Sequence, residues 1–373
     1  MERQRGIGRG AAISNGSLRR RYPTRRLGKS VGLLFAPAPL LLAACSSTPI
    51  VTPSLPLDAY AQPGTLVKVD AQRNLNIRCA GKGGPTVILT AGAGDQSLAW
   101  RSIQSSLSAH GRVCAWDRAG SGFSDPSSDV QDVEHRTRDL ERLLSGAGIK
   151  PPYILVGHSI GSFETLMFAF RHPAEVAGIV LIDPSSPDQN ERIREAAPAF
   201  YAILDPLQKG QLAQLEKCVS DAGRAPDIAD PDCLAPPTPE YPQALQDRLA
   251  RIDRQTAGKR NFLSMLDAMM SGRDSAQLKA SWRALGDLPL VVLTAGSPPP
   301  LPVTGKAAED VPRMQAEWAR MHDDIAHLST RGVNRTVAGA SHYIYMDQPE
   351  TVLAAIADIW AQARSRSGTG SGP

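Results

Sequence analysis

The chain has 373 residues, of which 42% are hydrophobic, so it is long enough to bury a large core, and we expect one domain with an insertion. Its formal net charge of +4 comes largely from an N-terminal basic segment, and the remainder is close to neutral. This distribution gives no electrostatic basis for binding nucleic acid, and we expect no nucleic-acid partner.

The first 45 residues have the composition of an export signal. A basic stretch precedes an apolar run, Val31 to Leu42, that is short for a membrane span and contains Pro37 and Pro39. Leu42-Ala43-Ala44-Cys45 closes the run and resembles the lipobox of bacterial lipoproteins. The resemblance implies that Cys45 is lipidated and holds the protein at a membrane of the bacterial cell envelope, facing the periplasm. Ser46 slightly favours the outer membrane. The alternative is an ordinary signal peptide with an incidental cysteine.

Strands and helices alternate after residues 46–65, a stretch rich in Pro, Ser and Thr that is predicted to be a tether. Apolar runs predict strands over 66–69, 75–79, 86–90 and 113–116. Periodic apolar residues predict helices over 97–110 and 132–144. This alternation indicates a mainly parallel sheet. The segment Asp117–Ser124 reads D-R-x-G-x-G-x-S and predicts a tight, hydrogen-bonded loop that shapes a neighbouring site.

The sequence Gly157-His158-Ser159-Ile160-Gly161 lies between an apolar strand pattern, Tyr153–Val156, and a helical pattern that begins near Phe163. It is therefore a G-x-S-x-G motif in the strand–turn–helix setting of a nucleophile elbow. The sharp turn needs an unusual backbone conformation at the serine, and side chains at the flanking glycines would clash with the neighbouring elements. A turn with a capping serine is the alternative interpretation.

After the elbow, a buried strand over 176–182 ends at Asp183, and the alternation then stops between residues 185 and 286. This insertion contains helical patterns over 243–254, 260–270 and 276–285. The alternation resumes with strands over 288–293 and 334–337, and a loop of small residues then leads to His342 just before the final helix. Residues 364–373 are predicted to be a disordered tail.

These motifs together, namely Ala91–Gly94, Asp117–Ser124, Gly157–Gly161, Asp183 and Ser341–His342, resemble the α/β-hydrolase fold superfamily over residues 66–363. The resemblance implies a mainly parallel central sheet flanked by helices. Residues 66–184 and 287–363 would form the core, and residues 185–286 would form a helical lid over the pocket. In the lid, Phe262, Leu263, Met265, Leu266, Met269 and Met270 either line an acyl site or pack the lid against the core.

The resemblance assigns Ser159 as the nucleophile and His342 as the base. Asp183 is the favoured acid, with Asp310 as the alternative, because the loop after the later strand carries no acidic residue before Glu309. By position, the backbone amides of Ala93 and Ile160 would form the oxyanion hole. Ala91 stands where the superfamily usually has a histidine. The other six histidines are predicted to be structural or solvated: His110, His135, His158, His172, His322 and His327.

Four cysteines remain if Cys45 is lipidated, an even number in an exported chain. Cys218 and Cys233 are close together within the lid, and Cys79 and Cys114 lie on strands that are neighbours in the usual hydrolase strand order. We therefore predict the disulfides Cys79–Cys114 and Cys218–Cys233. No pattern of cysteines and histidines indicates a metal site, and we expect no cofactor.

The implied chemistry is acyl transfer through a covalent Ser159 intermediate. A carboxylesterase acting on small or medium apolar esters is the favoured function, with a small-molecule acyl substrate as the partner. A nucleophilic serine argues against the dehalogenase and epoxide hydrolase branches, which use an aspartate there. Hydrolysis of another bond, acyl transfer to an acceptor, and a non-catalytic binding lipoprotein with the same fold stay open as alternatives.

Overall fold

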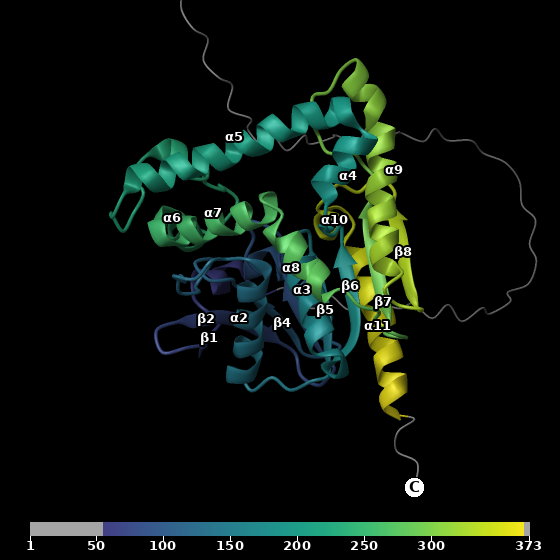
Figure 1. The fold of residues 1–373 in the computed structure, drawn as a ribbon. Helices are drawn as coiled ribbons and strands as arrows, with labels where there is room; N and C mark the ends of the chain where they lie inside the picture. The colour runs from purple at the N-terminus through teal and green to yellow at the C-terminus, as the bar shows by residue number, and fades with distance from the viewer. Residues whose placement is uncertain (1–54, 369–373) are drawn as a thin grey trace, which may run out of the picture. The chain divides into compact units, whose positions relative to one another are not determined.

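A computed structural model describes residues 55–368, so the predicted signal peptide, Cys45 and the first part of the tether lie outside the described residues. Within this part, eight strands form one sheet in the order β1-β2-β4-β3-β5-β6-β7-β8. β1 and β2 are antiparallel to their neighbours, and the other strands are parallel, which confirms the predicted α/β-hydrolase class (Figure 1). The strands are β1 (Thr65–Lys68), β2 (Asn74–Ala80), β3 (Thr86–Thr90), β4 (Val113–Trp116), β5 (Tyr153–His158), β6 (Val176–Ile182), β7 (Leu290–Ala295) and β8 (Gly332–Val337).

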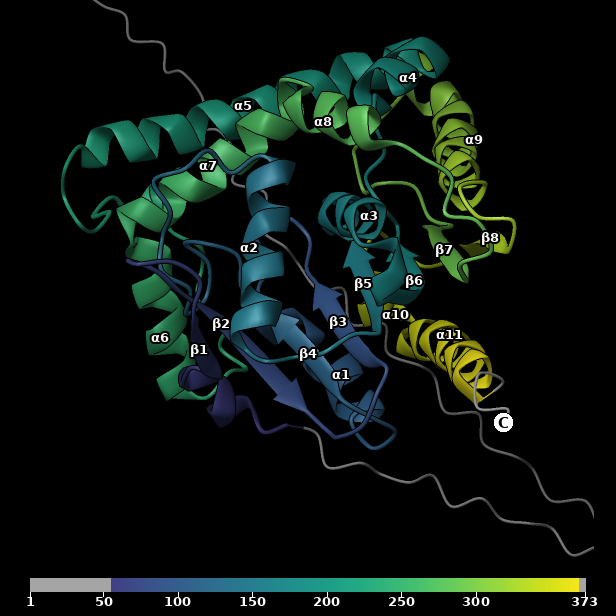
Figure 2. The same cartoon turned by 60° about the horizontal axis from the view of Figure 1, so that its bottom comes forward.

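Helices cover both faces of the sheet, which explains why its central strands are continuous apolar runs. Figure 2 shows α2 (Val133–Gly146) and α3 (Gly161–Arg171) on one face, and α1 (Arg101–Leu107) and α11 (Pro349–Gly368) on the other. Side chains alternate between the faces along each strand. In β5, Leu155 packs in the core cluster that contains α2 and α3, whereas Ile154 and Val156 pack in the cluster that contains α11.

The segment between β6 and β7 is the one that the sequence predicts to be a lid, and it is called the lid below. In the described chain it consists of α4 (Gln189–Ala196), α5 (Pro198–Ala222), the short η4 (Pro231–Cys233), α6 (Gln243–Arg254), α7 (Thr256–Met270) and α8 (Arg273–Ser281). In Figure 1 these helices lie across the end of the sheet at which the parallel strands finish. α9 (Lys306–Ala326), which follows β7, packs against α4 and α5 through a separate apolar cluster that includes Phe200, Met314 and Met321.

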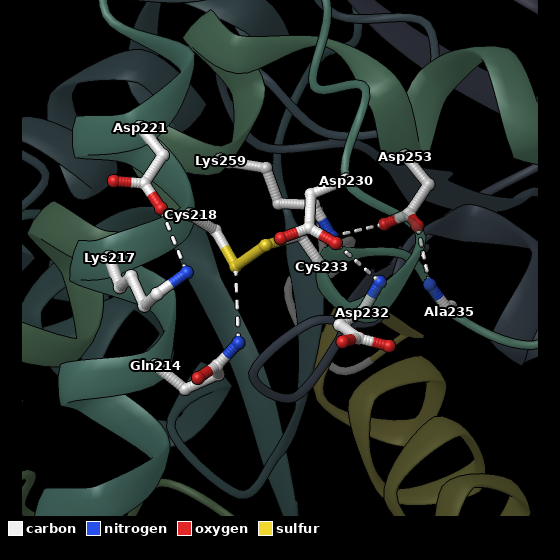
Figure 3. Close-up of a disulfide and its surroundings, with 10 residues drawn as sticks. All are labelled: Gln214, Lys217, Cys218, Asp221, Asp230, Asp232, Cys233, Ala235, Asp253 and Lys259. Atoms are coloured by element: carbon white, nitrogen blue, oxygen red, sulfur yellow. Dashed lines mark hydrogen bonds and ion pairs between the residues drawn. A yellow bond between two sulfur atoms is a disulfide. The ribbon is translucent and has the colours of Figure 1, made fainter.

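The described residues contain both disulfides that the sequence predicts. Cys79 and Cys114 are directly opposite each other on the antiparallel pair β2 and β4. Cys218 of α5 bonds to Cys233 of η4, as Figure 3 shows. The first bond therefore crosslinks the core sheet, and the second holds a loop of the lid onto its longest helix.

Two predicted boundaries differ from the structure. Residues Leu57–Ala61 form a 3-10 helix, and Tyr60 and Ala61 are buried against Leu245 of α6, so the last part of the predicted tether belongs to the folded domain. At the other end, α11 continues to Gly368, so the first residues of the predicted tail are helical. No helix between residues 55 and 368 is long and apolar enough to cross a membrane.

Candidate active site

Ser159 lies in the turn between β5 and α3, with a positive φ of 53°. Its amide donates to Ile182 O at 3.1 Å, and its carbonyl accepts from Ser185 N at 3.0 Å. The two motif glycines are required by close approach, as the sequence predicts. A Cβ at Gly157 would lie 2.6 Å from Thr165 Oγ1, and one at Gly161 would lie 2.7 Å from Ala91 O. The turn leaves Ser159 partly exposed beside the end of β6.

Asp183 and His342 form a hydrogen-bonded pair at the same edge of the sheet. Asp183 directly follows β6, in the stretch that Ser159 contacts on both sides through Ile182 and Ser185. His342 Nδ1 lies 2.6 Å from Asp183 Oδ2. The aspartate side chain is 5% exposed, whereas the histidine side chain is 41% exposed. The structure thus brings the predicted aspartate and histidine into contact, and it places the predicted serine on a turn whose backbone bonds to residues on either side of that aspartate.

The Asp183 carboxylate has further donors that the sequence did not reveal. Its Oδ1 accepts from Ala295 N and from Trp318 Nε1, both at 2.9 Å. Burial by itself raises the pKa of Asp183, but the hydrogen bond from His342, the electrostatic interactions with His322 and His342, and the Ala295 amide outweigh it and leave the pKa lowered. Asp183 is therefore held as a carboxylate that accepts from the imidazole.

His158 and His322 are both buried and support this edge. Burial, together with the charge of His342, lowers the pKa of His158 to about 3, so its imidazole is neutral. His158 Nε2 lies 3.0 Å from His342 O, which can only accept, so the proton is on Nε2. His322 Nε2 bonds to Pro184 O at 2.9 Å in the same way, next to Asp183. Both are buried and hydrogen-bonded, which fits a structural role. His158 bonds to the backbone of His342 itself, and His322 bonds to the backbone of Pro184, which follows Asp183.

The Asp310 carboxylate, the alternative acid, lies elsewhere. It accepts from Ala199 N at 2.7 Å, at the start of α5, and pairs with Arg313 at 3.3 Å. Asp310 therefore caps a lid helix, and its contacts are with α5 and α9 and not with His342.

Ala93 lies in the loop that follows β3, here called the β3 loop (Ala91–Gln96). Neither its amide nor that of Ile160, at the start of α3, donates to a backbone carbonyl among the described residues. Gly92 allows the loop to approach the elbow, because a Cβ there would lie 2.7 Å from His158 Nδ1 and 3.4 Å from Ser159 Cβ. Both predicted oxyanion amides are thus on segments next to Ser159, and neither donates to a backbone carbonyl in the part of the chain that the structure describes.

A cavity of about 490 Å³ lies between the β3 loop and the lid. Gly94 and Asp95, which directly follow Ala93, form part of its wall, and Phe262 lies close to Gly94. Phe262 and Met265 line this cavity, whereas Met269 and Met270 line a smaller one of about 60 Å³. Phe262, Met265 and Met269 also pack against the core. Three of the predicted lid residues, Phe262, Met265 and Met269, therefore both line a cavity and pack the lid onto the core.

One wall of the larger cavity is formed by the residues that come directly after the lid disulfide in the chain. Residues 234–238 line the cavity, and Cys233 before them is bonded to Cys218 (Figure 3). The Asp253 carboxylate holds the same segment by accepting from Ala235 N at 2.6 Å, and it also pairs with Lys259. Within residues 55–368, no group of three or more His, Cys, Asp or Glu side chains is placed to hold a metal ion.

Comparison with known proteins places the chain in a family. A model of the alpha/beta hydrolase family matches residues 87–355. The uncharacterized protein YqjL of Bacillus subtilis is 26% identical over 283 residues, covering 76% of this chain and 86% of that protein. Lipase LipV of Mycobacterium tuberculosis is 30% identical over 145 residues, covering 39% of this chain and 54% of that protein.

The fold is also similar to that of a solved structure, a thermophilic esterase from Thermogutta terrifontis. The TM-score is 0.50 at 19% identity, covering 81% of this chain and 99% of the esterase. The family model spans most of the folded domain, so membership of one family accounts for both the sheet order and the elbow geometry. The chain belongs to the alpha/beta hydrolase family.

Proposed function

We propose that the protein is a serine hydrolase that cleaves carboxylic esters with small or medium apolar groups. The observation that carries the proposal is the 2.6 Å bond between His342 Nδ1 and Asp183 Oδ2, beside a serine on a strained elbow. A buried carboxylate on Nδ1 leaves Nε2 free to take a proton, which is what a general base for a serine nucleophile needs.

In the acylation step, Ser159 Oγ attacks the ester carbonyl carbon and its proton passes to His342 Nε2. The carbonyl π electrons move onto oxygen, and the amides of Ala93 and Ile160 donate hydrogen bonds to that oxyanion. The tetrahedral intermediate then collapses. The bond to the alcohol oxygen breaks, this oxygen takes the proton from His342, and the acyl group stays on Ser159.

In the deacylation step, water attacks the acyl carbon while His342 accepts one of its protons. The second tetrahedral intermediate collapses, the bond to Ser159 Oγ breaks, and Oγ regains its proton from His342. Asp183 holds the imidazole in one tautomer and stabilises its protonated form in both steps. The products are a carboxylic acid and an alcohol.

The cavity beside the β3 loop supports an apolar substrate group. Its lid wall includes Leu234, Leu249 and Phe262, and its volume of about 490 Å³ is in the range of small-molecule sites. The similarity to the M. tuberculosis protein, which is named a lipase, supports an ester substrate.

Hydrolysis of p-nitrophenyl esters from acetate to laurate tests the proposal. We expect turnover by the wild type, loss of nearly all activity in Ser159→Ala, and full activity in Ser106→Ala, which changes a serine on α1 that bonds only to its own helix. Equal activity of Ser159→Ala and wild type would contradict the proposal. Adding an acceptor alcohol distinguishes hydrolysis from acyl transfer, because a transferase would form the new ester in preference to the free acid.

We also propose that Cys45 is lipidated and anchors the protein in the cell envelope. The support comes from the order of the N-terminal segments, in which a basic stretch is followed by an apolar run and then by Leu42-Ala43-Ala44-Cys45. Metabolic labelling with an alkyne fatty acid in a bacterial host should label the wild type and not Cys45→Ala, and the variant should leave the membrane fraction. Unlabelled wild-type protein, or an unchanged membrane fraction for the variant, would contradict this.

A further inference from the structure

The Arg118 side chain contacts the β3 loop through the backbone. Arg118 lies two residues after the end of β4, and its guanidinium donates to Ala91 O at 2.6 Å and to Gly92 O at 3.1 Å. Its Nε donates to Glu164 Oε1 at 2.6 Å, and the arginine side chain is only 8% exposed. The planar fork of the guanidinium thus holds two consecutive carbonyl groups in fixed directions.

The second of these carbonyls belongs to the same peptide unit as the Ala93 amide. This peptide is trans, so its C=O and N–H bonds point in opposite directions. A contact that turns Gly92 O toward Arg118 therefore turns the Ala93 N–H away from Arg118. The Asp95 amide also donates to Gly92 O, at 3.4 Å, and favours the same orientation. If the Gly92–Ala93 peptide unit rotated by half a turn, the Gly92 carbonyl oxygen, which accepts, would take the place of the Ala93 N–H, which donates.

We propose that Arg118 is a positioning residue that fixes the Gly92–Ala93 peptide so that the Ala93 amide serves as an oxyanion donor. The inference rests on the proposed function. The Ala91 side chain cannot form a hydrogen bond with the loop, so the orientation of the loop depends on groups outside it. Arg118, which is buried, donates two hydrogen bonds to the carbonyl groups of the loop.

The arginine is itself held by a buried chain of charges. The Glu164 carboxylate on α3 accepts from Arg118 and also from Arg136 of α2, at 2.8 Å, and Arg136 pairs with Asp274 of the lid helix α8 at 2.9 Å. Burial raises the pKa of Glu164, but the charges of Arg118 and Arg136 outweigh it and leave that pKa lowered.

The ionised Glu164 thus ties Arg118 to the helix whose start carries Ile160. Arg118 therefore links the two segments that bear the proposed oxyanion donors, by hydrogen bonds to the β3 loop and by a salt bridge to α3.

Arg118→Met removes all three contacts and tests the inference. Because loss of one oxyanion donor lowers kcat by about 10²–10³-fold, we expect a fall of about that size for ester hydrolysis, with KM changed less than about threefold. Arg118→Lys keeps the charge but not the planar fork of the guanidinium, so its kcat should lie between those of Arg118→Met and the wild type. A trifluoromethyl ketone, which adds to Ser159 Oγ to give a tetrahedral oxyanion, should lose affinity by a factor similar to the loss of kcat/KM.

Arg73→Met is the matched control, because it removes another buried arginine fork. Arg73 pairs with Asp139 through two bonds of 2.8 Å, on the turn between β1 and β2. This variant should lower the melting temperature and leave kcat unchanged, which separates general stability from positioning.

A folded Arg118→Met with wild-type kcat and inhibitor affinity would overturn the inference while the proposed function stands. If Arg118→Met does not fold, wild-type kcat in Arg118→Lys would overturn it in the same way. A wild-type protein that neither hydrolyses esters nor binds the ketone would instead overturn the proposed function, and the inference with it.

Discussion

Trp318 Nε1 donates to Asp183 Oδ1 at 2.9 Å, while His342 Nδ1 lies 2.6 Å from Oδ2 of the same carboxylate. The two oxygens of the Asp183 carboxylate therefore have different partners. One is fixed by an indole from α9, and the other faces the proposed base. A carboxylate that is held on one side presents a defined lone pair to the imidazole on the other.

Trp318→Phe should weaken the proposed triad without removing any of its members. Loss of a hydrogen bond to a charged group costs about 1.5–3 kcal/mol, so we expect kcat/KM to fall at least about tenfold. The Asp183 pKa should rise, because one donor to its ionised form is gone. Steady-state kinetics on an aryl ester measure the effect. Trp282→Phe is the control, because the Trp282 ring packs on Phe170 and not on Asp183, and this variant should keep wild-type kinetics.

The lowered pKa of Asp183 also makes a prediction for stability against pH. A carboxyl whose folded pKa lies below its unfolded pKa contributes stability above the unfolded value, near pH 4, and loses it as the pH falls through the folded value. The melting temperature of the wild type should therefore exceed that of Asp183→Asn at pH 6 and pH 5. The difference should shrink between pH 4 and pH 3. A difference that stays constant down to pH 3 would contradict the lowered pKa.

Gly92→Ala should disturb the β3 loop, because the new Cβ would lie 2.7 Å from His158 Nδ1 and 3.1 Å from its Cε1. The ring is buried, so the loop must shift, and we expect kcat to fall at least about tenfold since a small misplacement near the reacting atoms is costly. Gly210→Ala is the control. Gly210 is exposed within α5 with no atom near its Cβ position, and the change should stabilise the helix by about 0.5–1 kcal/mol with kcat unchanged. Equal kcat for both variants would contradict the packing argument.

Removing the lid disulfide should affect substrate size preference more than catalysis. In Cys218→Ala/Cys233→Ala, residues 234–238 lose the covalent hold of the bond that Figure 3 shows. The cavity wall that these residues form should then loosen. We expect the KM for a long-chain ester to rise and the kcat for an acetate ester to stay within about twofold. Thermal unfolding should show a loss of about 3 kcal/mol, the value for a closed loop of about 15 residues. If the two esters respond equally, the wall does not set chain-length preference.

The sheet was predictable because a parallel strand buried on both faces is an apolar run bounded by turn residues, as in β3 and β5. The placement of Ser159, Asp183 and His342 at one edge of the sheet was predictable, because each directly follows a strand or precedes a helix there. The choice of Asp183 over Asp310 needed the structure, because an aspartate after a strand can also be a turn cap.

The supporting contacts were not predictable, because they join segments far apart in the chain. Trp318 and His322 are four residues apart on α9 and lie on one face of it, but nothing local links that face to Asp183. Arg118 and Glu164 are separated by 46 residues. The longest lid helix, α5, contains Pro206, which ordinarily interrupts a helix, so its 25 residues could not be predicted from the local pattern.

Covalent labelling of the full-length protein with a fluorophosphonate is the most direct test of the central claim, that Ser159 is a nucleophile activated by His342 and Asp183. Intact mass and peptide mapping should show one adduct per molecule, located on Ser159. The labelling rate should fall steeply in His342→Ala and remain at the wild-type value in Ser106→Ala. A folded wild-type protein without an adduct, or one labelled elsewhere, would contradict the account.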